Sequence, residues 1–529
     1  MIADTSQDGA EVEGTLQELR LSSLREIEVK LEGEPQLLRR LFTLHALVGA
    51  TQRSRPQQLV STYFDTEDDA LERAGMTLRV RKSASGRVMA LKWTLYGEGP
   101  FARGEAEAFA RDDKPDPELL GAELAAMVNE ATGGQELVPR FVTCVRRQSG
   151  DLTSDSMRVE IGIDEGEIIA GDRRVPIAEC EMELKAGEPA ALFTLASRLT
   201  RDGLRLGPMQ KPQRGYRLAR GDAPAVVGAI NPKLGPESVT EDAIDAVVET
   251  TLTQFLGNWP ALLEADLPES IHQMRVALRR LCSGLALFEK ALPNAGFEPF
   301  RSEAALLASA LGPARDQDVF AALVAEGPLS VFPRDESFEA LLLVSVARRT
   351  RAYADARHLI AAPETSRFVL DLQAFVARRG WRNGLDTESL TKLTQLARIF
   401  AADTLGRLDQ RARKRGKGLL GLTPEERHRV RIALKNLRYG ADFFASLFDD
   451  GRCAKAFAKC LGNLQDVLGA DADAIIIYKT IATLELDAGP SASRAAGIVL
   501  GWCGHGARTS DSQLSDAWRA YLKVRRFWQ

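Results

Sequence analysis

The chain has 529 residues, which is long for one domain, and its 45% hydrophobic and 27% charged residues are ordinary for a soluble globular protein. The formal net charge of −4 at pH 7 is too small to indicate a polyanionic or polycationic partner by itself. The first twenty residues lack the basic start and apolar core of a signal peptide, and no apolar run approaches the roughly 18 residues of a membrane span.

The cysteines and histidines indicate the cellular compartment of the protein and whether a zinc site is expected. The six cysteines are scattered without a C-x-x-C pair, which is typical of reduced thiols in a cytoplasmic protein. The five histidines form no cluster with cysteine, so we expect no zinc site. We therefore predict a cytoplasmic protein without a membrane partner.

Short runs in which polar and apolar residues alternate fill the chain up to about residue 220. Alternation over such lengths predicts β-strands, because successive side chains of a strand point to opposite faces. Gly, Asp and Ser between many of the runs fit turns. The runs lie at 25–33, 59–66, 76–82, 87–95, 102–109, 141–148, 157–166 and 178–187. Helices are predicted at 34–47, after the first strand, and at 189–199, after the last.

The pattern of polar and apolar residues changes beyond residue 220. Residues 221–236 carry three Pro and three Gly, which indicates a linker. From 237 to 529 the apolar residues recur at three- and four-residue spacing, which predicts helices throughout. This half also repeats itself, because "HQMRVALRRL" at 272–281 matches "HRVRIALKNL" at 428–437 and "LGPARDQD" at 311–318 is echoed by "LGNLQDVLG" at 461–469. Two copies at so long a period predict a duplication within a helical bundle.

The polar faces of the predicted strands are unusual. In "REIEVKLEG", Glu26, Glu28 and Lys30 alternate with apolar residues, and the later strands repeat this pattern with Glu, Arg and Lys. A solvated sheet surface explains any single strand best. Taken together, however, the faces also fit a sheet that closes with its charged side inward. Carboxylates suit a hard divalent cation and Arg or Lys suit phosphate oxygens, so such a lumen would bind a metal–polyphosphate complex.

An ordered series of motifs then resembles the CYTH superfamily, which includes class IV adenylyl cyclases, thiamine triphosphatases and inorganic triphosphatases. The series runs over about 22–220 as "EIEVK", "YFDT", "LRVR", "ALKW", "RGEAE", "VRR", "IDEG", "ECEMELKAG" and "KPQRGYRL", with Gln210 where the family often has Ser before the lysine. The resemblance implies an α+β chain whose N-terminal domain is a closed antiparallel tunnel barrel of eight strands.

The resemblance also implies roles for individual residues. Metal-site carboxylates would be Glu26 and Glu28 together with two of Glu179, Glu181 and Glu183. The clamp on the triphosphate would consist of Lys30, Arg79, Arg81, Lys92, Arg103, Arg147, Lys211 and Arg214. Glu105 and Asp164 would be further polar partners, and Arg147 is preferred over Arg146 by motif spacing alone. The implied cofactor is Mg²⁺ or Mn²⁺.

Basic side chains gather on both copies of the helical repeat. At 100° per residue, His272, Arg275 and Arg279 share one side of their helix, beside a separate apolar stripe. A solvated face is the alternative for one helix, but the second copy repeats the layout. Such faces favour polyanions. The predicted polyphosphate-binding residues are His272, Arg275, Arg279, Arg280, Arg415, Lys417, His428, Arg431, Lys435 and Arg438.

The two repeats, each followed by an LG-x-x-x-D segment, resemble the CHAD domain over about 237–529. The resemblance implies an all-α bundle that binds inorganic polyphosphate on basic surfaces. Together the two halves predict a metal-dependent inorganic triphosphatase that hydrolyses tripolyphosphate and binds long-chain polyphosphate, without specific nucleic-acid binding and with an association with polyphosphate granules. The alternatives are hydrolysis of an organic triphosphate, cyclisation of ATP, and a non-catalytic granule-binding protein.

Overall fold

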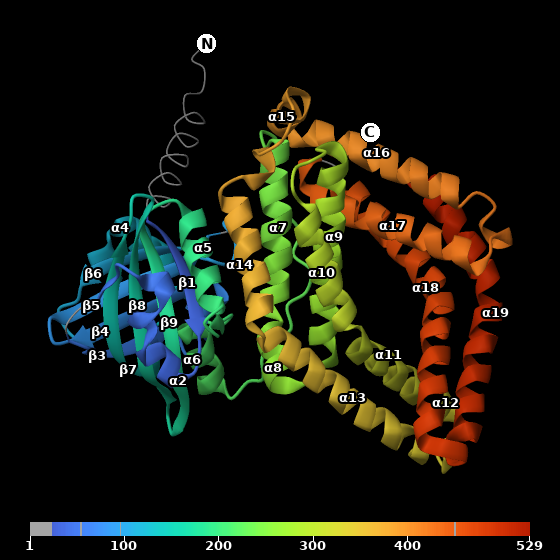
Figure 1. The fold of residues 1–529 in the computed structure, drawn as a ribbon, viewed down its shortest axis with the longest axis horizontal. Coiled ribbons are helices and arrows are strands. Elements are labelled where there is room, and N and C mark those ends of the chain that lie inside the picture. Colours follow the sequence, from blue (N-terminus) through green and yellow to red (C-terminus); the bar gives the residue numbers. More distant parts are fainter. Residues whose placement is uncertain (1–23, 53–54, 96, 449–450) are drawn as a thin grey trace. The chain divides into compact units, whose positions relative to one another are not determined.

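A computed structural model describes residues 24–52, 55–95, 97–448 and 451–529, and its contacts divide the chain into two compact units (Figure 1). The first unit contains the chain up to residue 225 together with residues 361–379. The second contains residues 226–360 and 380–529. Each unit is described by itself below.

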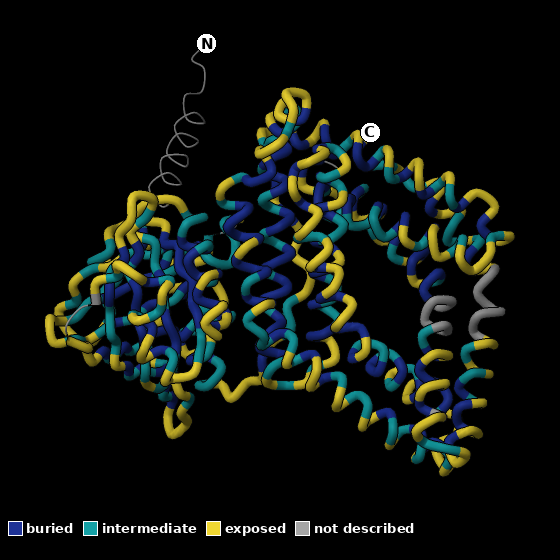
Figure 2. Tube along the Cα trace, viewed as in Figure 1, coloured by how far each residue is buried: buried dark blue, intermediate teal, exposed yellow. Residues whose placement is uncertain are grey.

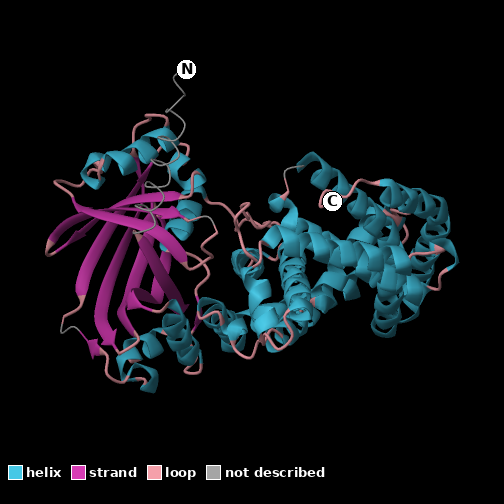
Figure 3. Ribbon diagram, turned by 90° about the horizontal axis from the view of Figure 1, so that it is seen from above, coloured by secondary structure: helices cyan, strands magenta, loops and turns pink. Residues whose placement is uncertain are grey.

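The first unit is built on a closed barrel, seen as the magenta strands of Figure 3. Eight strands pair in the order β1-β6-β5-β4-β3-β7-β8-β9, and β9 pairs again with β1, so the sheet closes on itself. Every pairing is antiparallel. The strands are β1 Arg25–Glu32, β3 Gln57–Asp65, β4 Met76–Ser83, β5 Gly86–Thr94, β6 Ala102–Phe109, β7 Val138–Thr153, β8 Met157–Ala170 and β9 Arg173–Gly187. The predicted eight-stranded antiparallel barrel is confirmed.

Helices cover the apolar outside of the barrel, which leaves the charged faces inward. Leu124 and Val128 of α4 (Ala122–Thr132) pack in one cluster with Leu78 of β4 and Leu91 of β5. Helix α5 (Pro189–Thr200) contacts β1, β8 and β9. Tyr216 of α6 (Lys211–Arg220) is buried with side chains of β3, β7 and β8. Burying the apolar face under helices provides the core of this unit.

The helix predicted over 34–47 is shorter than expected. The α-helix α2 spans only Pro35–Arg39, and two 3₁₀ turns, Leu41–Thr43 and His45–Leu47, follow it. Leu44 between these turns has an extended backbone (φ −72°, ψ 146°), so one continuous helix cannot pass through it. The separate turns still bury Leu38, Leu41 and Leu47, which satisfies the apolar periodicity that predicted the helix.

One helix of the first unit comes from far along the chain. Helix α14 (Pro363–Ala377) packs against α5. Asp371 of α14 accepts a hydrogen bond from Ser197 Oγ at 2.6 Å. Ser366 Oγ accepts one at 2.9 Å from the backbone N–H of Leu206, in the short strand β10 (Arg205–Leu206) that pairs with β1. Segment 361–379 is therefore part of the barrel unit, although it lies within the helical half of the sequence.

The second unit is helical, and residues 222–235, which join the barrel to the first helix of this unit, have no regular structure. Its helices include α7, which is buried over much of its length (Figure 2). The helices are α7 Thr240–Gly257, α8 Trp259–Ala265, α9 Pro268–Ala291, α10 Glu298–Ala310, α11 Gly312–Glu326, α12 Pro328–Val331, α13 Ser337–Ala361, α15 Thr387–Thr394, α16 Ala397–Arg415, α17 Pro424–Phe444, α18 Gly451–Ala488 and α19 Ser493–Lys523. The predicted all-α region is confirmed.

The two copies of the sequence repeat become matching helices that pack on one another. The first copy forms α9 and the second forms α17, and the two helices are in contact. Gly284 of α9 lies beside Phe443 of α17, where a Cβ would meet the ring at 3.5 Å. The echoed LG segments begin α11 and fall within α18, and these helices also pack together. No helix in the described part of the chain combines the length and apolar character needed to cross a membrane.

Candidate functional site

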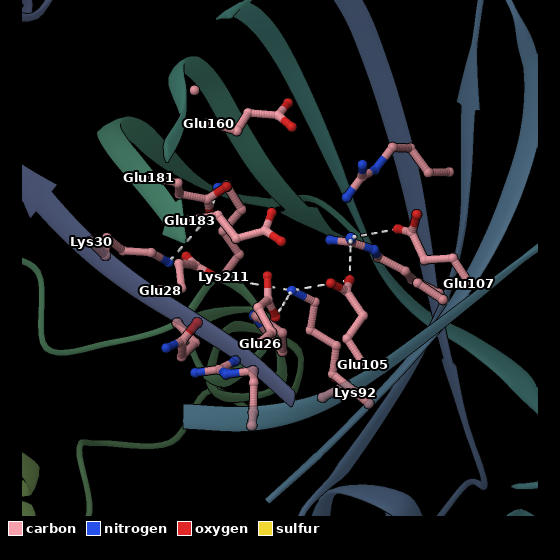
Figure 4. Close-up of a pocket in the computed structure, with 18 of the residues that line it drawn as sticks. Glu26, Glu28, Lys30, Lys92, Glu105, Glu107, Glu160, Glu181, Glu183 and Lys211 are labelled. Carbon is pink, nitrogen blue, oxygen red and sulfur yellow. Dashed lines mark hydrogen bonds and ion pairs between the residues drawn. The ribbon is translucent and has the colours of Figure 1, made fainter. Parts of the chain in front are cut away.

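The charged faces of the strands meet inside the barrel and line a cavity of about 190 Å³ (Figure 4). Its lining includes eight cationic side chains and seven carboxylates, so its fixed charges nearly balance. The cations are Lys30, Arg79, Arg81, Lys92, Arg103, Arg147, Lys185 and Lys211, and the acids are Glu26, Glu28, Glu105, Glu107, Glu160, Glu181 and Glu183. Charges enclosed in this way interact more strongly than charges on an open surface.

Most of the residues predicted for the tunnel line this cavity. Of the fifteen, only Asp164, Glu179 and Arg214 are outside the lining. Asp164 and Glu179 are fully buried behind it, and Arg214 contacts Glu179. Arg147 lines the cavity, whereas Arg146 is exposed.

Sequence reasoning missed several lining residues. Glu107 and Lys185 lie one alternate position beyond the predicted residues of β6 and β9, and Glu160 lies two alternate positions from Asp164 on β8. Their positions on the same face of the alternating pattern could have identified them as lining residues. Tyr63 of β3 and Gln210, the residue before α6, also line the cavity, and the charge pattern gave no signal for either.

A first carboxylate group, which we call the Glu26 group, consists of Glu26, Glu105 and Glu183, and these residues offer oxygens within 4.8 Å of one another. Lys92 Nζ lies 2.5 Å from Glu26 and 3.1 Å from Glu105. Burial raises the pKa of Glu26 to about 7 despite the attraction of Lys92, and burial also raises the pKa of Glu183. Nearby, Glu28 Oε1 is buried without a hydrogen-bond partner among the described residues. Burial thus outweighs the nearby cations at Glu26 and Glu183, although Lys185 pairs with Glu183. At Glu105, by contrast, Lys92 and Arg79 lower the pKa in spite of burial.

A second group, which we call the Asp164 group, has the opposite balance. It consists of Asp164, Glu179 and Glu181, again with oxygens within 4.8 Å of one another. Lys211 Nζ lies 2.7, 2.5 and 2.6 Å from their respective oxygens. Arg147 also pairs with Asp164 and Glu181. Although burial opposes ionisation, these cations hold the pKa of each carboxyl below its usual value. The protein's own cations therefore neutralise this group.

Arginines of β4 give another part of the cavity a positive field. Arg79 Nη2 lies 3.7 Å from Glu105 and 3.8 Å from Glu107, which are distances too long for strong hydrogen bonds. The charge of Arg79, together with burial and the charge of Arg147, lowers the pKa of Arg81 to about 10. Like charges held this close favour an anion between them. Guanidinium groups fit phosphate oxygens well, because they can donate two parallel hydrogen bonds.

Helix α6 brings Lys211 into the cavity, and a buried hydrogen bond fixes this helix. Tyr216 OH donates to Asp65 Oδ2 at 2.8 Å, and Asp65 also accepts from the backbone N–H groups of Leu71 and Glu72. Gly215 packs so closely on Phe141 that a Cβ would lie 2.1 Å from the ring. The aspartate of "YFDT" and the glycine of "KPQRGY" thus position α6, which sequence reasoning did not identify.

In the helical unit, the basic residues of α9 lie close together. Arg279 is exposed, and His272 and Arg275 are partly buried. Burial and the charge of Arg279 lower the pKa of Arg275 to about 10, and burial and Arg315 of α11 lower the pKa of His272. Arg315 thus adds a cation to this face that the repeat alone did not indicate. Crowded cations of this kind favour a bound anion.

The second copy places its basic residues similarly, and only Arg280 of the first copy departs from the prediction. His428 and Lys417 are exposed, and the others are partly exposed, namely Arg415, Arg431, Lys435 and Arg438. Arg280 of α9 does not belong to the basic face. It is buried, donates to the backbone oxygen of Ile230 at 2.7 Å and lies over the ring of Phe443. The position after Arg279 turns about 100° around the helix, which directs this side chain inward.

Comparison with known proteins gives two family matches, a CYTH domain at residues 24–216 and a CHAD domain at residues 246–481. An inorganic triphosphatase of Haemophilus influenzae is 29% identical over 200 residues, which cover 37% of this chain and 55% of that protein. An uncharacterized protein of Mycobacterium tuberculosis is 28% identical over 311 residues, which cover 56% of this chain and 58% of that protein. The matches thus span little more than half of these curated relatives.

Among solved structures, the crystal structure of the CHAD domain from the plant Ricinus communis is similar to this chain, with 26% identity and a TM-score of 0.46. The alignment covers 57% of this chain and 98% of that one. The order of the two family matches agrees with the order of barrel and helical unit along the chain. This chain therefore joins a CYTH domain to a CHAD domain.

Proposed function

We propose that the CYTH domain hydrolyses inorganic tripolyphosphate with the help of a divalent cation. The observation that carries this proposal is the cavity inside the barrel, whose lining combines eight cations with seven carboxylates. A non-catalytic anion-binding protein would need the cations but not the carboxylates. The similarity to a Haemophilus influenzae protein named inorganic triphosphatase supports the same conclusion.

The lining favours an inorganic chain over an organic triphosphate. Tyr63 is the one aromatic ring among the described residues of the lining, and it stands beside the arginines of β4. Thiamine or a nucleobase would need an apolar or aromatic surface to replace water. A phosphate chain instead needs charge-assisted contacts along its length, and the lining supplies these.

The residues of the Glu26 group fit a hard divalent cation. Their oxygens lie close together, the pKa values of Glu26 and Glu183 are raised, and Glu28 Oε1 is buried without a partner among the described residues. A cation such as Mg²⁺ or Mn²⁺ prefers carboxylate oxygens. Glu26, Glu28, Glu105 and Glu183 would hold it. When bound, it would offset phosphate charge and lower the pKa of water.

The cationic side chains would bind and orient the substrate. Arg79, Arg81 and Arg103 can each offer two N–H groups to one phosphate, while Lys30 and Lys92 act as point charges. Because the barrel fixes these groups before the substrate arrives, little reorganisation is needed as charge develops on the leaving phosphate. Holding the phosphate chain in line for attack by water is the main catalytic task of such a site.

Phosphate release from tripolyphosphate, thiamine triphosphate and ATP, measured side by side with Mg²⁺ or Mn²⁺, tests this proposal. We expect tripolyphosphate to have the highest kcat/KM by about tenfold or more, which corresponds to roughly 1.4 kcal/mol of transition-state stabilisation. EDTA should remove the activity. A preference for either organic substrate would contradict the inorganic assignment, and full activity in EDTA would contradict the cation.

We further propose that the basic faces of α9 and α17 bind long-chain polyphosphate, which would associate the protein with polyphosphate granules. The crowding of cations around His272 and Arg275 supports this proposal. Besides burial, Arg315 lowers the pKa of His272 more than Glu269 raises it, and Arg279 lowers the pKa of Arg275 more than Asp316 raises it. Because binding would release condensed counterions, the affinity of the full chain for polyphosphate should fall steeply as salt rises. Equal affinity for duplex DNA at matched charge and salt would instead indicate a general polyanion surface.

A further inference from the structure

The three alternating carboxylates of β9 have different surroundings, although they share one face of the strand. Glu181 and Glu183 line the cavity. Glu179 does not line it, and its side chain is completely buried. The family pattern leaves open which two of these residues meet a divalent cation, and the structure separates them by depth.

Both oxygens of Glu179 already face cations of the protein. Oε1 forms ion pairs without a hydrogen bond among the described residues, at 2.5 Å from Lys211 Nζ and 3.2 Å from Lys30 Nζ. Oε2 lies 3.3 Å from Arg214 Nη1. These partners come from two separate elements, since Lys30 is on β1 and the other two are on α6. A divalent cation could reach Glu179 only by displacing buried ion pairs, which would leave uncompensated charges behind.

The strand register explains why Glu179 needs these cations. Asp164 of β8 stands directly opposite Glu179, and like charges at opposite positions of neighbouring strands repel. Lys211 lies within 2.7 Å of an oxygen of each and bridges them. Asp164 and Glu179 therefore hold the ammonium group of Lys211 together. Glu179 also pairs with the ammonium group of Lys30.

We propose that Glu179 is a positioning residue of the triphosphate site, which holds Lys30 and Lys211 at the cavity wall and fixes Arg214 behind them, and that it is not a ligand of the divalent cation. This inference rests on the proposed function, because Lys30 and Lys211 matter to the reaction only if they meet phosphate. Without the Glu179 carboxylate, both ammonium groups would lose a fixed partner and sample other positions. Substrate would then meet a clamp that has to be ordered during binding.

The test compares Glu179→Gln with Glu183→Gln in the full chain, because both changes remove one charge and keep the shape of the side chain. Mn²⁺ binding without substrate, followed by the electron paramagnetic resonance signal of free Mn²⁺, reports on the cation site alone. We expect Glu183→Gln to weaken Mn²⁺ binding about tenfold or more, since a charged oxygen ligand is lost. Glu179→Gln should keep the Mn²⁺ dissociation constant within about twofold of the unmodified protein.

Tripolyphosphate kinetics at saturating Mn²⁺ give the second measurement. Glu179→Gln should raise KM about tenfold or more while kcat falls less, because ground-state binding to the clamp is weakened. Glu179→Asp keeps the charge on a shorter side chain and should recover part of the loss. If Glu179→Gln does not fold, the double variant Glu179→Gln with Arg214→Gln replaces it, because it removes the carboxylate together with one of its cationic partners. Its Mn²⁺ dissociation constant should also stay within about twofold of that of the unmodified protein.

The outcomes separate this inference from the proposed function. If Glu179→Gln weakens Mn²⁺ binding as much as Glu183→Gln does, Glu179 is a ligand and the inference is wrong. If Glu179→Gln changes neither Mn²⁺ binding nor KM, Glu179 positions nothing of importance. If the unmodified protein neither binds nor hydrolyses tripolyphosphate, the proposed function itself fails.

Discussion

The cavity of the barrel and the basic faces of α9 and α17 both present cationic side chains. The cavity is surrounded by strands and also contains carboxylates, whereas the faces of the helices are open to solvent. Inside the barrel, carboxylates accompany the cations, and every charged lining residue lies on a strand or on α6. On α9 and α17, basic side chains stand partly exposed on helices. A cation–phosphate complex needs both signs in a fixed arrangement, whereas retention of a long anion needs only one.

The difference teaches where each kind of change should act. If the proposed function holds, a lost carboxylate in the cavity should affect turnover, because carboxylates would hold the divalent cation. A lost cation on α9 should affect affinity in proportion to the charge removed.

Glu28→Ala should lower the turnover of tripolyphosphate by about two orders of magnitude or more without unfolding the protein, because it removes a buried oxygen that we assign to the cation. Phosphate release and circular dichroism measure the two effects. Glu167→Ala is the matched control, since Glu167 is a partly exposed residue of β8 that lies outside the cavity lining and pairs with Arg174. An active Glu28→Ala variant would move the cation site elsewhere.

Arg79→Ala should lower kcat/KM for tripolyphosphate about tenfold or more, because a charge-assisted contact to phosphate is worth roughly 1.5–3 kcal/mol. Arg87→Ala, on the neighbouring strand β5, removes an arginine whose partner is the exposed Asp113, and it should change kcat/KM less than about twofold. Equal effects of the two substitutions would place Arg79 outside the substrate contacts.

Reversing charge on α9 with Arg275→Glu and Arg279→Glu should weaken polyphosphate binding several-fold and reduce its dependence on salt, with tripolyphosphatase activity unchanged. Fluorescence anisotropy with labelled polyphosphate at several salt concentrations measures this. Arg494→Glu is the control, because Arg494 is an exposed residue of α19 paired with Asp335. If the control weakens binding equally, net charge rather than the α9 face determines affinity.

Much of the barrel could be predicted from the sequence, because strand alternation is local. The runs at 76–82 and 102–109 correspond to β4 and β6 within one residue. Closure depends on pairing between β1 and β9, which are about 150 residues apart in the sequence, so periodicity allowed a closed sheet and the family resemblance supplied it. The docking of α14 on α5 had no local signal at all.

In the candidate site, too, the sequence predicted which face of a strand carries a residue but not how deeply that residue is buried. Alternation placed Glu179 and Glu183 on one face of β9, but it could not show that one is buried behind the cavity and the other lines it. Depth depends on which cations arrive from other elements, such as Lys211 on α6. Likewise, helical periodicity grouped Arg280 with its neighbours, while packing against Phe443 decided its burial.

The last prediction concerns two carboxylates whose pKa values are both raised to about 7, the buried Glu26 of the cavity and the partly buried Asp245 of α7. Burial is the main cause for Asp245, and the charge of Asp242 adds to it. A raised pKa means that the folded state keeps its proton while the unfolded state has lost it. Asp245 therefore destabilises the fold as pH rises from about 4 to about 7, and the loss then levels off.

Asp245→Asn should remove this loss, because the amide stays neutral at every pH. We expect the variant to become more stable than the unmodified protein as pH rises from 4 to 8, with the difference vanishing toward pH 4. Urea unfolding of the full chain at pH 4, 6 and 8 measures it. Mn²⁺ should not change this difference, whereas it should oppose the cost of ionising Glu26, since only Glu26 lies among carboxylates that can share a cation. A variant that loses stability at pH 8 would show that Asp245 is ionised and paired in the folded protein.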